Sequence, residues 1–589
     1  MEKLTIPCKL SIDWLRENYL NKRLTPEDVA EEIVRRSERD AAMNIWITPP
    51  SAAGMRPYLE RLKAIDPADA PLWGIPFAVK DNTDVVGMAT TAACPAFTRM
   101  PAEDAAVVKR LLDAGAIPVG KANLDQFATG LVGTRSPYGE THNALRPELI
   151  SGGSSSGSAV AVARGQAAFA LGTDTAGSGR VPAALNGLVG FKPSLGAWPL
   201  RGVVPACESL DCVTVFAHSM KEAYAVDAAA RGTDERDPWS RKVPSPQAGL
   251  PLKICLPKET PSFFGPFAQE YASAWAAVVR RIEGLNLPVE YVDTEPLSEA
   301  AAVLYEGPWV AERWAGLGEF IETHPGEALP VTEGILRSGA ERSASELFRA
   351  MHKLQATRLR TAALLKDAVL VLPTAGGTWT REEVRRDPVA TNRDMGRYTN
   401  HCNLLGMCAA AIPAGEAAPA LPFGVTLFAL ADREGLLAGT ASLLGEPNAE
   451  YLAAPAASGS SKIKTTPVAV CGLHMRGFPL EKQMLGCGAR FVREDVTTAK
   501  YKLLKLPTEP AKPGLIKSEA GGGAIRLEIW EMPLDRFGEF AASIPGPLGI
   551  GKVELADGSE VPGFICEGYA EDLSENITAF GGWRDAVRA

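Results

Sequence analysis

Two glycine-serine clusters separated by a short apolar segment constrain this chain more than any other feature. They span residues 152–158 and 173–179, and the segment between them contains the runs AVAVA and AAFAL. Flexible linkers rich in glycine and serine stay polar, whereas these two runs read as buried. Each cluster is therefore predicted at the end of a buried element, where glycine lets backbone N–H groups approach a reacting atom. An oxyanion hole is built in this way.

Two other glycine-rich motifs compete with this interpretation. A phosphate-binding P-loop would continue into Gly-Lys-Ser or Gly-Lys-Thr, and neither follows Gly157. Residues 153–157 match the nucleophile-elbow pattern Gly-x-Ser-x-Gly, which requires an apolar strand just before it. The preceding residues contain Pro147, which is poorly suited to a central strand. The elbow is therefore a minority interpretation.

Lys80 is a candidate base for a serine in these clusters. It ends the apolar, strand-like run WGIPFAVK. A solvated lysine has a pKa of about 10.4 and is a poor base at neutral pH, but burial would lower that pKa because it disfavours the ammonium. The alternative is an ordinary lysine whose head group reaches solvent, and this alternative is favoured if Lys80 is taken alone.

Together these pieces resemble the amidase signature family, hydrolases with a Ser-Ser-Lys triad, over roughly the first three quarters of the chain. Position by position, the resemblance implies that Ser178 is the nucleophile, Ser154 the bridging serine and Lys80 the base. In that family the bridging serine follows a cis peptide bond. The resemblance also implies an oxyanion hole made by the backbone N–H groups of Thr175, Ala176, Gly177 and Ser178.

The signature also points to a subfamily. It departs from the commonest family pattern at Ser156, Ala176 and Gly179, none of which is a triad position. These departures, and a C-terminal extension that ends in the stretch 576–584, resemble allophanate hydrolases. The resemblance implies hydrolysis of allophanate (urea-1-carboxylate) to ammonia and N-carboxycarbamate through an acyl-enzyme, with no metal or organic cofactor. It further implies urea carboxylase as the functional partner and a homodimer.

Tyr305 and Arg313 are the candidate substrate anchors. They lie eight residues apart, about two helical turns, so a roughly helical path would place them on one side. A guanidinium is well shaped to bind a carboxylate through two hydrogen bonds. Spacing alone favours a surface arginine paired with Glu306 or Glu312. The subfamily resemblance favours a role in substrate binding, because the matching tyrosine and arginine of allophanate hydrolases hold the substrate carboxylate. The same resemblance implies that Gly130 lines the pocket.

The pattern of elements predicts an α/β fold with two domains. Strand-like and helical stretches alternate, and the resemblance implies a large twisted mixed β-sheet covered by helices. We expect the amidase domain over residues 1–445, a linker over 446–466 and a second domain over 467–589. Short apolar runs in the second domain favour a small α+β fold. The resemblance implies that this fold is similar to that of γ-glutamyl cyclotransferases. In that domain His474 matches a histidine implicated in decarboxylating N-carboxycarbamate, although a lone histidine after a strand is more often structural.

Composition excludes several other classes. The net charge of −9 gives no general attraction to nucleic acid. The first residues lack the apolar region of a signal peptide and no apolar run approaches a membrane span, so we expect a cytoplasmic protein. Ten cysteines without a C-x-x-C pair favour free thiols over disulfides or zinc.

Two functional alternatives remain. A glutamine amidotransferase subunit for aminoacyl-tRNA, or another amidase of a small amide, would need a different pocket. A non-catalytic binding protein on the same scaffold should have lost Lys80, Ser154 or Ser178, and all three are present.

Overall fold

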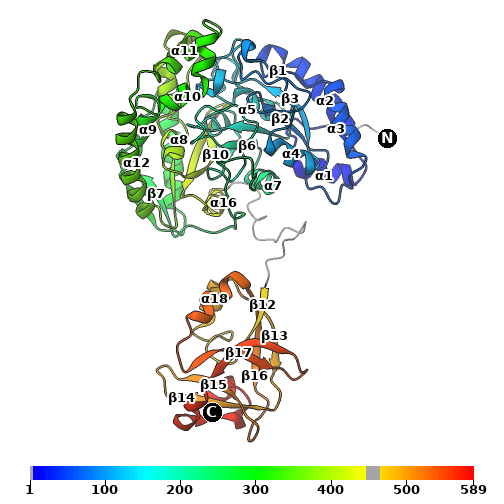
Figure 1. Ribbon diagram of the computed structural model, residues 1–589, viewed down its shortest axis with the longest axis vertical. Coiled ribbons are helices and arrows are strands. Elements are labelled where there is room, and N and C mark those ends of the chain that lie inside the picture. Colours follow the sequence, from blue (N-terminus) through cyan, green and yellow to red (C-terminus); the bar gives the residue numbers. More distant parts are fainter. Residues whose placement is uncertain (1–3, 446–464, 589) are drawn as a thin grey trace. The chain divides into compact units, whose positions relative to one another are not determined.

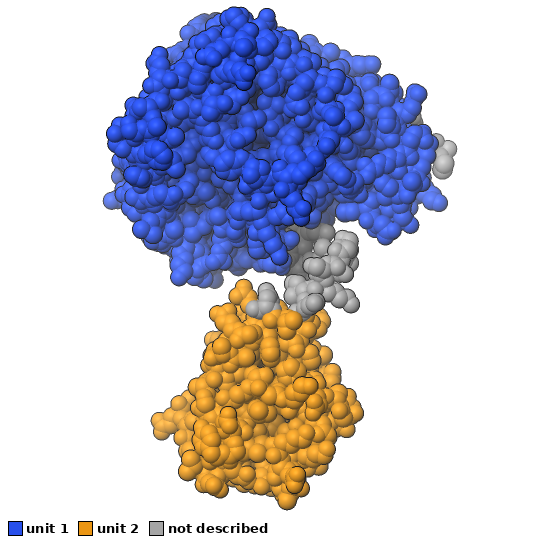
Figure 2. All heavy atoms as spheres, in the orientation of Figure 1, with its two compact units in different colours: residues 1–456 blue, residues 457–589 orange. Residues whose placement is uncertain are grey.

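The computed structural model describes residues 4–445 and 465–588. It divides the chain into two compact units, residues 1–456 and 457–589, which Figure 2 colours separately. The predicted linker 446–466 lies outside the described residues except for Thr465 and Thr466, which begin the first strand of the second unit. The predicted α/β class with a large mixed sheet is confirmed in the first unit.

The first unit is built on an 11-stranded sheet in the order β1-β3-β2-β4-β6-β5-β10-β11-β9-β7-β8. The sheet is mixed, since β2 runs parallel to β3 and β4 whereas β10 is antiparallel to β5 and β11. Its strands are β1 (Trp46–Thr48), β2 (Pro76–Lys80), β3 (Ile117–Ala122), β4 (Phe169–Thr173), β5 (Val189–Lys192), β6 (Val213–Ala217), β7 (Lys253–Pro257), β8 (Val289–Val292), β9 (Ala368–Pro373), β10 (Cys408–Ala418) and β11 (Leu421–Ala429).

Helices cover this sheet, with α1 to α3 near its β1 end and α9, α10 and α12 near its β7 end (Figure 1). Helix α2 begins at Pro26, and Thr25 and Asp28 form a capping box at its start. The helices are α1 (Ile12–Leu20), α2 (Pro26–Arg39), α3 (Ala52–Leu62), α4 (Ala106–Asp113), α5 (Ser156–Ala163), α6 (Val181–Leu185), α7 (Met220–Ala230), α8 (Ala268–Glu283), α9 (Glu295–Tyr305), α10 (Val310–Thr323), α11 (Pro330–Arg337), α12 (Ala344–Leu364), α13 (Arg381–Arg386), α14 (Ala390–Met395), α15 (His401–Leu404) and α16 (Glu434–Leu443).

The centre of the sheet positions the two clusters singled out from the sequence. Strands β2 and β4 are neighbours, parallel and buried along their whole length, and the rings of Phe77 and Phe169 stack between them with centroids 5.1 Å apart. Because parallel strands end at the same edge of a sheet, Lys80 and Thr173 come together there. Helix α5 begins at Ser156 and is buried from Ser156 to Val162, as its small residues allow.

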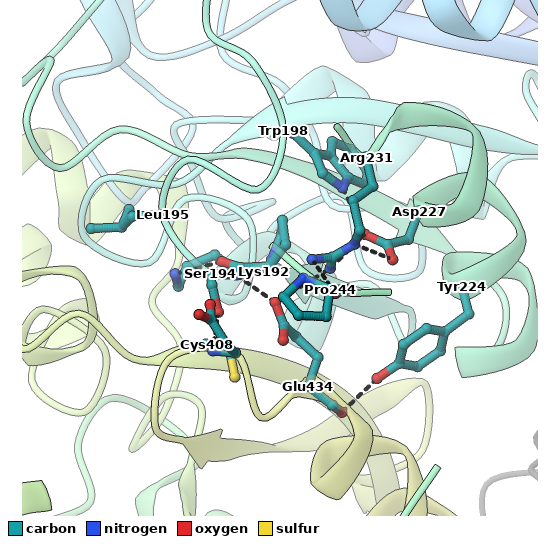
Figure 3. A network of polar contacts seen from close by, with 12 residues as sticks. Lys192, Ser194, Leu195, Trp198, Tyr224, Asp227, Arg231, Pro244, Cys408 and Glu434 are labelled. Atoms are coloured by element: carbon teal, nitrogen blue, oxygen red, sulfur yellow. Dashed lines mark hydrogen bonds and ion pairs between the residues drawn. The ribbon is translucent and has the colours of Figure 1, made fainter. Parts of the chain in front are cut away.

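A buried charged network fixes the segment that follows β5 (Figure 3). Arg231 donates from Nε to Asp227 (2.9 Å) and from Nη2 to Glu434 (3.3 Å). The indole of Trp198 donates to Asp227 at 2.6 Å, and the Ser194 N–H donates to Glu434 at 2.9 Å. The two carboxylates and the guanidinium are nearly inaccessible to solvent, so their pairing offsets the cost of burial and joins α7, α16 and residues 194–198.

The second unit is a small α+β fold with a hydrophobic core of its own, built around large side chains such as Trp530 and Tyr501. It contains a five-stranded sheet, β13-β16-β12-β18-β17, and a three-stranded sheet, β15-β14-β19. Its elements are β12 (Thr465–Val470), α17 (Glu481–Gly486), β13 (Arg490–Val496), β14 (Tyr501–Leu506), β15 (Lys512–Lys517), β16 (Arg526–Pro533), α18 (Leu534–Ala542), β17 (Leu548–Glu554), β18 (Glu560–Cys566), β19 (Glu575–Asn576) and α19 (Trp583–Ala586).

All ten cysteines are free thiols, as predicted. No helix within the described residues is long and apolar enough to cross a membrane.

Candidate active site

Lys80 lies at the carboxyl end of β2 and has no exposed surface. Its Nζ donates to Ser154 Oγ at 2.7 Å and to Thr173 Oγ1 at 2.7 Å. Burial lowers the pKa of Lys80 from 10.5 to about 7, although the surrounding carboxylates of Asp125, Asp211 and Asp174 oppose the shift. The alternative of a lysine whose head group reaches solvent is therefore wrong, and the burial of Lys80 favours the neutral amine.

Ser154 follows the cis peptide bond Gly153–Ser154 that the resemblance implied. The Ser154 carbonyl accepts the Asp125 N–H at 3.0 Å, and the Asp125 carboxylate accepts the backbone N–H groups of Gly133 (3.0 Å) and Arg135 (2.9 Å). A Cβ atom on Gly153 would lie 2.0 Å from Asp125 Oδ2. Only glycine therefore fits between Asp125 and Ser154.

Ser178 lies on a tight turn between β4 and α6. Asp174 supports this turn, because its carboxylate accepts the Gly179 N–H at 3.1 Å and two guanidinium N–H groups of Arg180, each at 2.9 Å. Gly177 has φ +146°, and a Cβ there would lie 2.3 Å from Thr399 Oγ1. Ser178 is 4% exposed, whereas Lys80 and Ser154 are 0% exposed, so of the three it is the one with surface that solvent reaches.

The backbone around Ser178 carries unpaired donors. Within residues 4–445 and 465–588, the N–H groups of Thr175, Ala176, Gly177 and Ser178 have no hydrogen-bond acceptor. The Thr175 hydroxyl donates to Asp211, and the same carboxylate accepts the Ala206 N–H at 2.7 Å. Buried backbone donors are almost always satisfied in folded proteins. Four consecutive unpaired donors therefore suit a ligand oxygen that carries negative charge.

Arg313 and Tyr305 form a second polar group near the first. Helix α9 ends at Tyr305 and helix α10 begins at Val310, so the path between Tyr305 and Arg313 is not one continuous helix. Arg313 is 1% exposed; it donates to the Tyr305 hydroxyl at 3.2 Å and to Thr129 Oγ1 at 2.9 Å. Its Nε has no partner within the described residues. The interpretation of Arg313 as a surface arginine paired with Glu306 or Glu312 is therefore wrong. Arg313 is instead a buried guanidinium with one N–H group that has no acceptor among the described residues.

Comparison with known proteins identifies the family. The sequence profile described as "Amidase" matches residues 28–437. The chain belongs to the amidase family. Residues 466–588 match the profile "Allophanate hydrolase C-terminal domain". We therefore refer to the first unit as the amidase unit.

Individual relatives agree with both matches. The chain is 42% identical over 548 residues to the urea amidolyase of Lachancea kluyveri, which covers 88% of this chain and 30% of that protein. It is thus similar to less than a third of that relative's length. A solved Kluyveromyces lactis allophanate hydrolase superposes with a TM-score of 0.81 at 38% identity, covering 98% of this chain and 99% of that one. A glutamyl-tRNA(Gln) amidotransferase component from Synechococcus is 33% identical, covering 62% of this chain and 82% of that protein.

The amidase unit also contains site residues that the sequence interpretation missed. Thr173 accepts a hydrogen bond from Lys80, Thr129 accepts one from Arg313, and Asp125 and Asp211 hold the two loops. Gly130 follows Thr129, and a Cβ there would lie 2.6 Å from Asp125 Oδ2. Sequence position could have indicated two of these four residues, because Thr173 begins the second glycine-serine cluster and Thr129 precedes Gly130.

His474 belongs to the second unit and is described there alone. Its Nε2 lies 3.0 Å from Gln483 Oε1, and its ring stacks on Phe564 with centroids 4.8 Å apart. Burial lowers the pKa of His474 below its ordinary value. His474 also lines a cavity of about 310 Å³.

Proposed function

We propose that this amidase hydrolyses allophanate in urea degradation. The observation that carries the proposal is the buried guanidinium of Arg313, which contacts Tyr305 and Thr129 and has a free Nε–H. A buried cation with an unused donor needs an anion, and allophanate presents a carboxylate beside an amide. The match of the whole chain to a solved allophanate hydrolase supports the same substrate.

In the proposed acylation, Lys80 acts as the base through Ser154. Neutral Lys80 takes the Ser154 proton, Ser154 takes the Ser178 proton, and Ser178 Oγ bonds to the terminal carbamoyl carbon. The resulting oxyanion accepts hydrogen bonds from the backbone N–H groups of Thr175 through Ser178. When the carbon–nitrogen bond breaks, its electron pair stays on the leaving nitrogen, which takes the Ser154 proton and departs as ammonia. Ser154 is reprotonated from Lys80.

Deacylation uses the same groups in reverse. Water gives a proton through Ser154 to Lys80 and bonds to the acyl carbon, and the bond to Ser178 then breaks as its Oγ takes a proton back. The product is N-carboxycarbamate. Arg313 and Tyr305 would hold the carboxylate throughout, and such fixed orientation contributes about 7–11 kcal/mol to well-positioned reactions.

The second unit offers a candidate site for the next step. Loss of carbon dioxide from N-carboxycarbamate leaves an electron pair on nitrogen, which takes a proton and gives carbamate. We propose that His474 assists this decarboxylation from its cavity. Urea carboxylase would supply the substrate, and a homodimer remains the family prediction for assembly.

A component of a glutamine amidotransferase is the second candidate, supported by the 33% identity to the Synechococcus relative. That relative covers 62% of this chain, whereas the solved allophanate hydrolase covers 98% of it. The match of residues 466–588 to the allophanate hydrolase C-terminal domain also favours the first candidate.

The deciding experiment is ammonia release from potassium allophanate by the purified full chain, without ATP or biotin, with glutamine as the parallel substrate. We expect turnover of allophanate and a loss of at least 10²-fold in kcat/KM in Arg313→Ala, because the buried anion site disappears. Arg337→Ala is the matched control, since Arg337 is a half-exposed arginine that pairs with Glu333 on the neighbouring helix α11. Turnover of glutamine alone would refute the assignment and keep only the amidase chemistry.

A further inference from the structure

The second unit contains a cavity of about 310 Å³, a volume at the lower end of small-molecule sites. Its wall comes from the end of β12, from α17, from the start of β15 and from the segment between α18 and β17. Leu473, Leu480, Ile544, Leu548 and Phe564 make much of this wall apolar. The cavity lies within one compact unit, so its geometry needs nothing from the amidase unit.

The charged side chain in this wall is positive. Among the described residues that line the cavity is Lys512, and no aspartate or glutamate is among them. Lys512 is partly buried and has no ion pair among the residues that the structure describes. Five other lysines of the same unit each lie within 4.0 Å of a glutamate carboxylate: Lys500, Lys502, Lys505, Lys517 and Lys552. Lys512 is therefore an ammonium placed in a largely apolar wall without the carboxylate partner that those five lysines have.

His474 does not supply a competing charge. Gln483 Oε1 lies 3.0 Å from its Nε2, which favours the tautomer that carries the proton on Nε2. Burial lowers the pKa of His474, and the nearby ammonium of Lys512 adds to this shift. At neutral pH the wall thus combines one cation with a neutral imidazole and an apolar surface, an arrangement that selects a small anion.

We propose that Lys512 is the anion-binding group of this cavity and holds one carboxylate of a small dicarboxylate whose remainder lies against His474 and Phe564. The identity of that dicarboxylate as N-carboxycarbamate rests on the proposed function. The anion site itself rests only on the unpaired ammonium and the acid-free wall. A carboxylate there gains a charge-assisted hydrogen bond in surroundings that screen charge less than water does.

The first test measures binding of malonate, a stable dicarboxylate, to the full chain by calorimetry. The measurements use an Arg313→Ala background, which removes the anion site of the amidase unit. We expect Lys512→Gln to weaken malonate binding by about tenfold or more. Lys482→Gln, which changes an α17 lysine outside the cavity wall, should leave binding unchanged. Malonamide, which has no carboxylate, should not bind. Equal malonate affinity with and without Lys512 would overturn the proposal.

The second test uses the native chain and so does not depend on any variant folding. Lysines are acetylated with limiting acetic anhydride, and labelling is followed peptide by peptide by mass spectrometry. Malonate should slow the labelling of Lys512 several-fold and leave Lys482 unchanged; unaltered labelling of Lys512 would overturn the proposal. Both tests use malonate, so a failure of the chain to hydrolyse allophanate would not affect their outcome.

Discussion

Replacing Lys80 with methionine tests the central claim, that a buried neutral lysine is the base. The pKa of Lys80 falls from 10.5 to about 7, and a shift of this size corresponds to about 5 kcal/mol at about 1.4 kcal/mol per unit. Below pH 7 both the folded and the unfolded chain hold the proton. Between pH 7 and about 10 the unfolded chain binds more protons, so stability rises with pH.

Two measurements follow from this shift. First, kcat/KM for ammonia release should rise tenfold per pH unit below about pH 7 and level above it, and Lys80→Met should lose about 10²–10⁴-fold. Second, we follow guanidinium denaturation of the amidase unit at pH 7 and at pH 9. The free energy of unfolding of the wild type should rise by about 2 kcal/mol relative to that of Lys80→Met. A flat pH profile in the wild type, or a methionine variant with more than a tenth of the activity, would refute the reasoning.

Two further substitutions examine the serine and the turn. Ser154→Ala removes the hydroxyl that accepts a hydrogen bond from Lys80, so kcat should fall about 10²–10⁴-fold with little change in KM; a loss below threefold would exclude the relay. Gly177→Ala places a Cβ 2.3 Å from Thr399 Oγ1 at φ +146°, so it should lower kcat about 10²-fold and stability by about 1–3 kcal/mol. The control is Gly334→Ala in helix α11, where a Cβ meets no atom within 4 Å; it should stabilise the protein slightly. Equal losses of kcat and stability in Gly177→Ala and Gly334→Ala would contradict this account.

Local pattern was enough to predict the elements that end at the site. An apolar run that finishes in Lys80 predicted a strand, which is β2, and the small residues between the two glycine clusters predicted buried elements, which are α5 and β4. Burial and glycine placement are properties of neighbouring residues. The helix breaks between Tyr305 and Val310, where Gly307–Pro308 cannot continue it.

The supports of the site were beyond such reasoning. Asp125 contacts Gly153, and Asp211 receives a hydrogen bond from Thr175 across 36 residues. Neither aspartate is distinguished by its neighbours in the sequence, and each acts only after the sheet has brought distant loops together. The burial of Arg313 is similar: the spacing of charges along α10 favoured a surface ion pair, and tertiary packing placed the guanidinium against Thr129 instead.

Asp125 links the geometry of the site to the charge of Lys80, the proposed base. It supports the loop beside Ser154 through the N–H groups of Gly133 and Arg135, and among the surrounding charges it raises the pKa of Lys80 most. Asp125→Asn keeps the size of the side chain, removes the charge and loses one acceptor. The Lys80 pKa should therefore fall, and the rising limb of kcat/KM should move to lower pH while its plateau drops. The pH profile separates this from simple damage, because a misplaced loop lowers the plateau without moving the midpoint. A midpoint that stays near pH 7 or moves upward would show that the charge of Asp125 does not raise the pKa of Lys80.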